Sequence, residues 1–300
     1  GAPEGTLFSM TRIAVVGAQG MLGRDLVERL AKEHAVVGLS RSQLDITDAQ
    51  SVNAVITGFD VVVNAAAYTA VDDAETHREE AFAINAHGAQ NLASRCRDAN
   101  TRLIHVSTDY VFDGTADVPY AEDARTNPQS VYGASKLAGE EAVMAENPDS
   151  SLIVRTSWLY GLHGTSFPRS ILQAGLTRDY LDVVNDQWGQ PTWTVDVAEM
   201  IAQLVKAEIG AGVFHATNAG ATTWHAFATA LFDLAGWDTA RVRETTSAAF
   251  TRPAARPAWS VLGHDGWTDR GLPTPRPWED ALTEAWTAGL SQFAIAEPSA

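Results

Sequence analysis

A tyrosine and a lysine four residues apart are the pair in this sequence best suited to acid–base chemistry. Tyr132 and Lys136 lie in a run of good helix formers from Val131 to Ala145, so both side chains leave one helix face about one turn apart. A free phenol has a pKa of about 10, and a nearby ammonium group lowers it toward the range useful for proton transfer. The pair therefore predicts a tyrosine that protonates an oxygen as negative charge develops on it. The same spacing also occurs on many solvated helices, so the pair needs support from other residues.

Polar side chains follow two segments that are predicted to be buried strands. Ser107 and Thr108 come directly after Arg102–Val106, and Trp158 follows Ser151–Thr156 in the same register. Open α/β sheets bind their ligands at the carboxyl ends of the strands. We therefore expect Thr108 to lie beside the Tyr–Lys pair. Trp158 is a candidate wall for a sugar ring, and packing against the core is an almost equal alternative.

A glycine loop near the amino terminus predicts a dinucleotide site. The apolar run Ile13–Val16 ends in three glycines spaced G-x-x-G-x-x-G, and apolar residues then recur at helical spacing. Such glycines allow a tight turn, a close approach to a pyrophosphate and close helix packing, and the helix amino terminus favours negative charge. The residues expected to contact the cofactor are Gly17, Gly20, Met21, Leu22 and Gly23.

The end of the second predicted strand bears on the choice between NADPH and NADH. Ser40 and Arg41 follow Ala35–Leu39, where an NAD-preferring site would usually offer Asp or Glu to the adenosine ribose. A guanidinium group and a hydroxyl suit a 2′-phosphate better, so we expect NADPH, with NADH as the alternative and a solvated Arg41 as the competing explanation. Asp45 and Ile46 are expected at the adenine edge, although Asp45 could instead cap a helix.

The third predicted strand, Asp60–Asn64, leads into Ala65, Ala66 and Ala67, whose small side chains would let the backbone lie flat against a cofactor. Helices alternate with strands throughout this half of the chain, for example from Glu79 to Ala99, which predicts an α/β fold: a Rossmann-like, doubly wound parallel sheet with a smaller α/β substrate-binding lobe. The expected divisions are an extension or tag at 1–9, an NAD(P)-binding core of 10–165 with 191–221, a substrate-binding lobe of 166–190 with 222–290, and a flexible tail at 291–300.

The composition excludes several classes of partner. The 300 residues carry a net charge of −16, which disfavours nucleic acids and anionic membranes as partners. No apolar run approaches the ~18 residues of a membrane span, and the single cysteine, Cys96, excludes an internal disulfide framework. We therefore expect a cytoplasmic protein. The eight histidines are scattered without a pair at ligand spacing, so no metal site is predicted.

Several separate motifs together resemble the extended short-chain dehydrogenase/reductase family. They are the glycine loop, the Asn64–Ala67 strand end, Ser107–Asp109 and the Tyr132-x-x-x-Lys136 pair. More narrowly, Ser107–Gly114, Arg155–Tyr160 and Asn185–Thr192 are similar to the motifs of dTDP-4-dehydrorhamnose reductases. The resemblance covers nearly the whole chain from Met10 to about Leu290.

This resemblance implies that NAD(P)H reduces the C4 ketone of dTDP-4-dehydro-6-deoxy-L-mannose to give dTDP-L-rhamnose. It implies that Tyr132 is the general acid, and that Thr108 hydrogen-bonds the carbonyl oxygen or the phenol. Lys136 would lower the pKa of Tyr132 and hold the nicotinamide ribose. Asp109 and Trp158 would contact the sugar. Arg256 would bind the pyrophosphate, although Trp259 stands where relatives often have a small polar residue.

Some members of that family bind magnesium at a dimer contact through glutamates. Asp25 could stand in for one ligand, but Val195 occupies the place of another, so no metal is predicted and the homodimer is an expectation from the resemblance alone. Three alternatives share the fold: a sugar-nucleotide epimerase, a dehydratase and a non-catalytic regulatory subunit. A dehydratase would have Glu where this chain has Tyr110, and a regulatory subunit would not need the complete Thr108, Tyr132 and Lys136 set.

Overall fold

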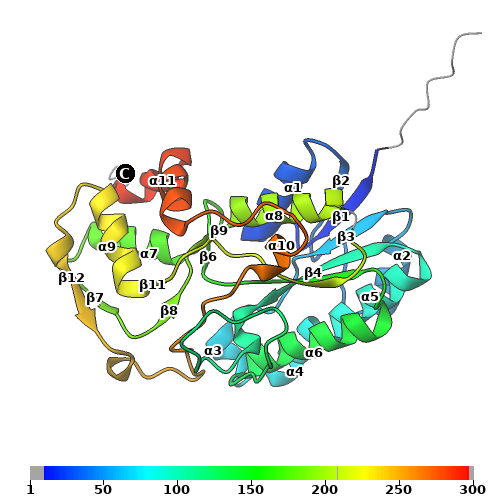
Figure 1. Cartoon of the computed structure of the whole chain (residues 1–300), viewed down its shortest axis with the longest axis horizontal. Helices are drawn as coiled ribbons and strands as arrows, with labels where there is room; N and C mark the ends of the chain where they lie inside the picture. The colour runs from blue at the N-terminus through cyan, green and yellow to red at the C-terminus, as the bar shows by residue number, and fades with distance from the viewer. Residues whose placement is uncertain (1–9, 208, 297–300) are drawn as a thin grey trace, which may run out of the picture.

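A six-stranded parallel sheet forms the centre of the larger lobe in the computed structural model, which describes residues 10–207 and 209–296 (Figure 1). The strand order is β10-β5-β4-β3-β1-β2. The strands are β1 (Arg12–Val16), β2 (Ala35–Leu39), β3 (Val61–Asn64), β4 (Arg102–Thr108), β5 (Ser151–Thr156) and β10 (Gly212–His215). The chain order reverses at β1, which pairs with β2 on one side and β3 on the other. This reversal opens a crevice at the carboxyl ends of β1 and β3, the usual ligand position in such sheets.

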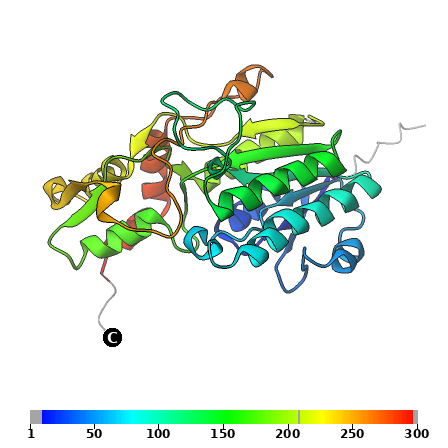
Figure 2. The same cartoon turned by 90° about the horizontal axis from the view of Figure 1, so that it is seen from below.

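Helices cover both faces of this sheet, as the two views in Figures 1 and 2 show. On one face lie α1 (Met21–Leu30) and α8 (Thr194–Ala207), and on the other α2 (Ala49–Val55), α5 (Ala89–Asp98) and α6 (Val131–Glu146). In β1, Ile13 and Val15 pack into the core cluster of the first face, whereas Ala14 and Val16 pack into that of the second. Burial on both faces explains why the strands are apolar without alternation. The doubly wound fold expected from the sequence is confirmed.

The helix predicted from Glu79 to Ala99 is divided into three parts. It comprises α4 (Arg78–Phe82), a π-helical turn η1 (Ala83–Gly88) and α5. Asn85 lies in the π-helical turn, and a Cβ atom at Gly139 of α6 would overlap the Asn85 carbonyl oxygen. A glycine therefore lets α6 pack closely against the turn. Because π-helical turns often occur at functional sites, this position is considered again below.

The smaller lobe is assembled from two separated stretches of the chain, seen on the left of Figure 1. Its main elements are α7 (Phe167–Gly175), β7 (Leu181–Val184), α9 (Trp224–Leu234), β12 (Val242–Thr245) and α11 (Trp278–Ala288). Parallel pairing of β7 with β12 joins the two stretches. Two further pairs were not expected from the sequence: β6 (Leu159–Tyr160) pairs with β9 (Thr192–Trp193), and β8 (Trp188–Gly189) pairs with β11 (Thr222–Thr223).

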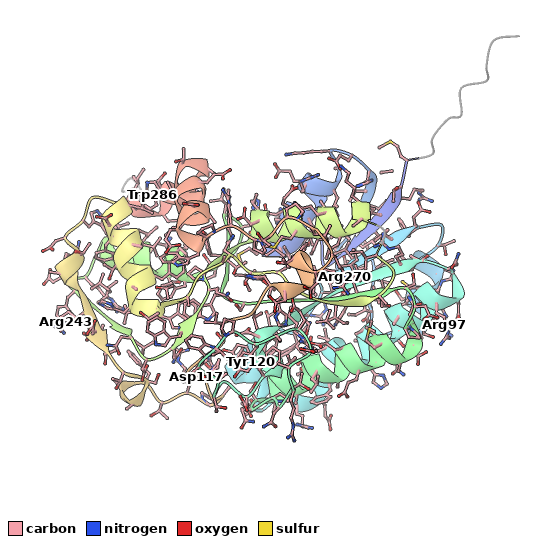
Figure 3. All side chains as sticks on the ribbon, viewed as in Figure 1. Arg97, Asp117, Tyr120, Arg243, Arg270 and Trp286 are labelled. Carbon is pink, nitrogen blue, oxygen red and sulfur yellow. The ribbon has the colours of Figure 1, made fainter. Side chains whose placement is uncertain are left out.

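A long loop after β4 packs against a late segment of the chain around Val261. Tyr120 and Asp117 of this loop are labelled in Figure 3. The Tyr120 amide donates to the Val261 carbonyl (2.9 Å), and the Gly263 amide donates to the Tyr120 carbonyl (2.7 Å). The remaining short elements are α3 (Val71–Ala74), η2 (Asp109–Val111), η3 (Thr239–Arg241), η4 (Ser247–Ala249) and α10 (Asp265–Thr268).

The end of the chain differs from expectation. A flexible tail was expected from residue 291, but η5 (Leu290–Ala294) forms a 3-10 helix there. Leu290 is fully buried, and Phe293 packs against the core of the smaller lobe, because its apolar ring covers surface that would otherwise face water. The expected extension at 1–9 and the last part of the tail, 297–300, lie outside the described residues.

Candidate active site

A cavity of about 270 Å³ lies at the carboxyl ends of β1, β2 and β3. It brings together most of the residues expected to bind a dinucleotide: Gly17, Gly20, Ser40, Arg41, Asp45, Ile46, Ala65, Ala66 and Ala67. Met21, Leu22 and Gly23 form the first turn of α1 beside it. Leu44, Thr47 and Ile84 also line the cavity. Sequence reasoning missed these three because nothing in their residue types marks a contact.

The glycine loop is shaped for close approach between two strand ends. Gly17 has a positive φ of 78°, and a Cβ atom there would lie 2.7 Å from the Ala66 nitrogen, so only glycine fits. The Asn64 side chain accepts a hydrogen bond from the Ala66 amide (3.1 Å) and thereby fixes the alanine backbone opposite. The first turn of α1 contains no acidic residue, so its free amides and positive dipole end suit a phosphate group.

The adenosine side of this cavity is held by local hydrogen bonds. The Ser40 amide and hydroxyl donate to Gln43 Oε1 (2.8 and 3.0 Å), and Arg41 lies exposed at the rim. Asp45 accepts from the amide and hydroxyl of Thr47 (3.0 and 2.7 Å), which lowers the pKa of its carboxyl group. The cap of α2 is instead Asp48, so the helix-capping alternative for Asp45 is wrong.

The proposed acid–base set lies where β4 ends against α6. Lys136 is buried, and its Nζ atom donates to the Val106 carbonyl at 2.8 Å. Burial lowers the pKa of Lys136 to about 8, with the Glu140 carboxylate acting in the opposite direction. Burial also raises the pKa of Tyr132 to about 12, and a hydrogen bond with Thr108 opposes this shift. The expected lowering by Lys136 is therefore not found, because desolvation of the phenol dominates in the ligand-free protein.

Thr108 and Asp109 form the polar end of β4. The Thr108 hydroxyl accepts from the Tyr110 amide (3.2 Å) and donates to Asp109 Oδ1 (3.0 Å). Asp109 is only 4% exposed, and its Oδ2 atom has no hydrogen-bond partner within the described part of the chain. Burial raises the pKa of Asp109 to about 7. A buried carboxyl oxygen without a donor is suited to accept a hydroxyl of a bound ligand.

The start of α6 is held against both the β4 end and the π-helical turn. Ser130 caps the helix by accepting from the Gly133 amide (3.0 Å), and a Cβ atom at Gly133 would overlap the Tyr110 carbonyl oxygen. Asn85 donates to the Ser135 hydroxyl (2.9 Å) and accepts from the Tyr68 amide (2.8 Å). These contacts fix the orientation of the helix face that carries the Tyr–Lys pair.

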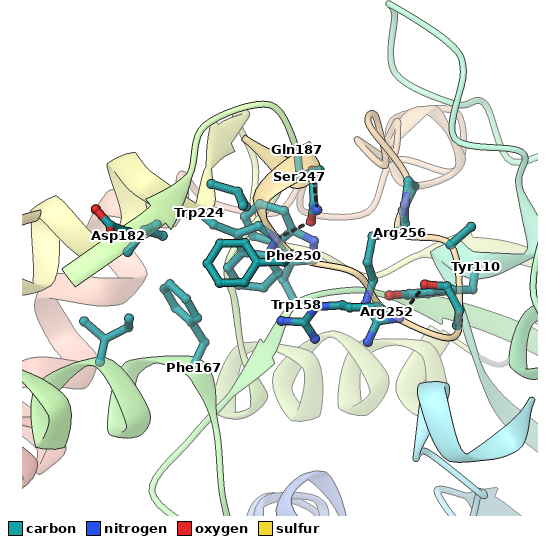
Figure 4. Close-up of a pocket in the computed structure, with 16 residues that line it drawn as sticks. Tyr110, Trp158, Phe167, Asp182, Gln187, Trp224, Ser247, Phe250, Arg252 and Arg256 are labelled. Carbon is teal, nitrogen blue, oxygen red and sulfur yellow. Dashed lines mark hydrogen bonds between the residues drawn. The ribbon is translucent and has the colours of Figure 1, made fainter. Parts of the chain in front are cut away.

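A second, larger cavity of about 660 Å³ lies between the lobes (Figure 4). Trp158 borders it and stacks on Trp224, with ring centroids 3.5 Å apart and planes 12° from parallel. Phe167 and Phe250 extend this apolar end. Tyr110 borders the cavity and contacts the Tyr132 ring edge to face at 5.4 Å. The cavity therefore reaches from an aromatic wall to the neighbourhood of the acid–base set.

Two arginines from a late loop lie between the aromatic wall and Tyr110 (Figure 4). Arg256 donates to both carboxylate oxygens of Asp72, each at 2.9 Å, and Arg252 lies 3.8 Å from the same carboxylate. These hydrogen bonds, opposed by partial burial, lower the pKa of Asp72. Sequence reasoning missed Asp72 and Arg252, although the repeated Arg-Pro motif was a usable signal for the second arginine.

No cluster of three or more His, Cys, Asp or Glu side chains within the described residues could hold a metal ion. Asp25, one magnesium candidate, is buried and accepts from the Thr194 hydroxyl at 2.5 Å, and burial raises its pKa. Val195, the residue after Thr194, is 37% exposed. The structure also contains, in its described portion, no helix that combines the length and apolar character of a membrane span.

Comparisons with known proteins agree over nearly the full length. Residues 10–290 match the family model of the RmlD substrate binding domain. The chain is 49% identical to a dTDP-4-keto-6-deoxy-D-glucose reductase of Streptomyces niveus, covering 92% of this chain and 96% of that protein. It is 47% identical to a dTDP-4-dehydrorhamnose reductase of Streptomyces griseus, covering 94% and 95% respectively. Its structure is similar, with a TM-score of 0.90 and 35% identity, to a Bacillus anthracis dTDP-4-dehydrorhamnose reductase in complex with NADP, covering 93% of this chain and 100% of that one.

Proposed function

Because the chain belongs to the RmlD substrate binding domain family, we propose that it catalyses the NADPH-dependent reduction of the C4 ketone of dTDP-4-dehydro-6-deoxy-L-mannose to dTDP-L-rhamnose. The observation that carries this proposal is the position of Thr108, Tyr132 and Lys136. Lys136 donates to the Val106 carbonyl of β4, Thr108 at the end of the same strand hydrogen-bonds Tyr132, and Tyr132 contacts Tyr110 at the wall of the larger cavity. The names of the curated relatives and the NADP complex of a solved relative support the reaction class and the cofactor.

The side chains of the set divide the acid–base work between them. At neutral pH Tyr132 keeps its proton, because burial raises its pKa to about 12, so a proton donor is available for the oxygen of a ketone. Thr108 hydrogen-bonds to the phenol and can orient it toward that oxygen. Lys136 remains largely protonated below about pH 8 and stabilises negative charge that develops nearby. Positioned general acids of this kind contribute roughly 10²–10⁴-fold to a rate.

The smaller cavity fits a dinucleotide phosphate. NADPH, when bound there, would supply the hydride. Gly17 and Gly20 with the amino terminus of α1 would hold the pyrophosphate, and Ala65, Ala66 and Ala67 present flat backbone. Gly17 lies so close to Ala66 that a Cβ atom would not fit there. The loop backbone is therefore bare at this point, which suits the close approach of a cofactor. Ser40 and Arg41 at the rim would bind the 2′-phosphate, which favours NADPH over NADH.

Residues at and near the larger cavity would hold the diphosphate and the sugar of a nucleotide sugar. Arg256, with its planar fork of donors, would release Asp72 and bind the diphosphate in its place. Asp109, which follows β4 and does not itself line this cavity, would accept a sugar hydroxyl at its Oδ2 atom. Trp158 offers an aromatic wall of the cavity. The cavity lining contains two arginines among mostly uncharged side chains, which supports binding of a small doubly charged group and not of a nucleic acid.

These positions support a division of labour between the lobes. We assign cofactor binding to 10–165 with 191–221 and substrate binding to 166–190 with 222–290. The net charge of −16 and the single buried cysteine, Cys96, support action in the cytoplasm on a free nucleotide sugar. A homodimer, which the family resemblance suggests, would be tested by the mass of the protein in solution.

The test measures NADPH oxidation with the 4-keto sugar nucleotide prepared from dTDP-glucose, both before and after epimerisation. We expect oxidation that depends on the epimerised ketone, with dTDP-L-rhamnose as product, and Tyr132→Phe as the inactive control. Oxidation with only the unepimerised ketone would favour a second candidate, a dTDP-4-keto-6-deoxy-D-glucose reductase. The 49% identity to such an enzyme is the observation that supports this candidate. Cofactor binding without oxidation of either ketone would favour an epimerase, a dehydratase or a regulatory subunit.

A further inference from the structure

A buried ion pair lies directly beneath the acid–base set and has no part in the mechanism described above. Glu140 follows Lys136 by one turn of α6 and is 5% exposed. Arg155 of β5 donates to it from Nη2 (2.7 Å to Oε1) and from Nε (3.0 Å to Oε2). The Ser107 hydroxyl donates to Oε2 at 2.5 Å. Glu140 thus joins α6, β4 and β5 at one point.

The remaining guanidinium nitrogen of Arg155, Nη1, also has hydrogen-bond partners. It donates to the Glu122 carbonyl (3.1 Å) and to His215 Nε2 (3.3 Å). His215 can accept there because its Nδ1 faces the Gly263 carbonyl at 3.1 Å. Burial, and then the charge of Arg155, lower the pKa of His215 to about 3. The histidine is therefore neutral, and Arg155 provides the positive charge that offsets Glu140.

A charged cluster at this place needs an explanation other than stability. Replacing a buried ion pair with apolar side chains of similar volume is often neutral or stabilising, and a helix-to-sheet contact is ordinarily apolar. Here Ser107 immediately precedes Thr108, and Glu140 shares a helix face with Lys136. The cluster therefore joins the strand end and the helix turn that carry the two groups.

We propose that Glu140, held by Ser107 and Arg155, is a positioning residue that aligns Thr108 with Lys136 and supplies the negative charge that keeps Lys136 protonated. The inference rests on the proposed reductase function for the role of alignment, but its electrostatic part concerns the ligand-free protein. Glu140 opposes the effect of burial on the pKa of Lys136, which agrees with the geometry.

Other titratable groups surround Lys136, and Glu140 is the carboxylate whose charge opposes the effect of burial on its pKa. His105 of β4 is neutral, because burial and then the charge of Lys136 hold its pKa well below the ordinary value. Two other carboxylates are engaged at the ends of α6. The Glu75 carboxylate accepts from the Val131 amide at the start of the helix, and Glu146 at its end pairs with Arg97. The other titratable groups on packed elements include Arg155 and His215, Tyr132 and Asp109, Tyr110 on η2, Arg95, Cys96 and Asp98 on α5, Asp72 and Asp73 on α3, and the exposed Arg78, Glu79, Glu80 and His87 on α4 and η1.

The chain contains only three lysines, Lys32, Lys136 and Lys206, which makes a direct measurement simple. In protein labelled with ¹³C at lysine Cε, each resonance moves as its ammonium group loses a proton. Lys32 and Lys206 are exposed and serve as internal references, and Lys136→Arg assigns the third signal. We expect the Lys136 midpoint near pH 8 and a decrease of about one pH unit in Glu140→Gln, the lower end of the effect of a close opposite charge.

Glu141→Gln is the matched control, because it removes the same charge from the next residue, which is exposed. It should leave the Lys136 midpoint unchanged. An equal midpoint in Glu140→Gln and the wild type would overturn the electrostatic part of the proposal. This measurement requires no turnover, so its outcome is independent of whether the proposed reductase function is correct.

Two further variants separate alignment from charge and cover the case in which Glu140→Gln does not fold. Glu140→Asp keeps the charge but shortens the side chain, and Ser107→Ala removes only the hydroxyl donor. We expect both to keep the Lys136 midpoint within about 0.5 pH units, as a retained charge at similar distance implies, and to lower kcat about tenfold with KM for NADPH nearly unchanged. Unchanged kcat in both variants would overturn the alignment role, whereas a wild type that oxidises no NADPH would refute the proposed function instead.

Discussion

Asp109 should make the protein less stable as the pH rises, which is the reverse of the usual behaviour of a paired carboxyl group. Burial raises its pKa from 3.8 to about 7. Between these two values the folded protein keeps a proton on Asp109 that the unfolded chain has lost. Folding stability therefore falls with increasing pH across that window, and the loss is complete once the folded form has ionised above about pH 7.

The magnitude follows from the two pKa values. Integrating the difference in bound protons from about pH 5 to about pH 8 gives roughly 2.5 kcal/mol of lost stability from this one side chain. Asp109→Asn removes the ionisation while keeping the shape. We therefore expect the stability difference, variant minus wild type, to increase by roughly 2.5 kcal/mol over that interval, whatever constant offset the amide introduces.

Urea unfolding followed by tryptophan fluorescence measures this difference, because nine tryptophans report on the fold. Asp113→Asn is the control from the same loop. Hydrogen bonds from Thr115 and Tyr120 lower the pKa of Asp113, so it is ionised in both states throughout the interval and its difference should be flat. A flat difference for Asp109→Asn as well would show that Asp109 is not desolvated in the folded protein.

Three further substitutions test the candidate site. Tyr132→Phe should leave NADPH affinity unchanged and lower kcat roughly 10²–10⁴-fold; single-turnover rates near those of the wild type would remove Tyr132 as the acid. Arg41→Ala should weaken NADPH more than NADH in titrations of cofactor fluorescence, and equal losses would argue against a 2′-phosphate contact. Arg256→Ala should weaken dTDP by about 1.5–3 kcal/mol, the value of a charge-assisted hydrogen bond, without changing NADPH affinity. Calorimetry measures both, and parallel losses would point to a general unfolding of the loop.

Local patterns predicted the elements whose signals lie close together in the chain. The apolar run before Gly17, the glycine spacing and the following helix are contiguous, so β1 and α1 could be placed directly from the sequence. The same is true of β4 and of α6 with the Tyr–Lys pair. Their meeting at one sheet edge followed from the rule that parallel strands direct their carboxyl ends to the same side.

Features that depend on distant residues could not be predicted. Arg256 pairs with a carboxylate 184 residues earlier in the chain, and Trp158 stacks on Trp224 of the smaller lobe. The β6–β9 and β8–β11 pairs contain two residues per strand, too few to show alternation. The pKa of Tyr132 was expected to fall, but it rises because burial by the folded chain outweighs the hydrogen bond with Thr108.

The interleaved assembly of the smaller lobe has a consequence for how the protein is made. Every residue that lines the dinucleotide cavity lies between Val16 and Ile84, whereas the larger cavity needs residues as late as Pro257. A ribosome therefore completes the residues of the dinucleotide cavity long before it completes those of the larger cavity. Until α8 and Trp267 emerge, one face of the sheet lacks the part of its cover that α1 does not supply, and exposed apolar strands of this kind favour aggregation. The nascent chain is thus most vulnerable in the interval between its two halves, when a chaperone or early cofactor binding would help it most.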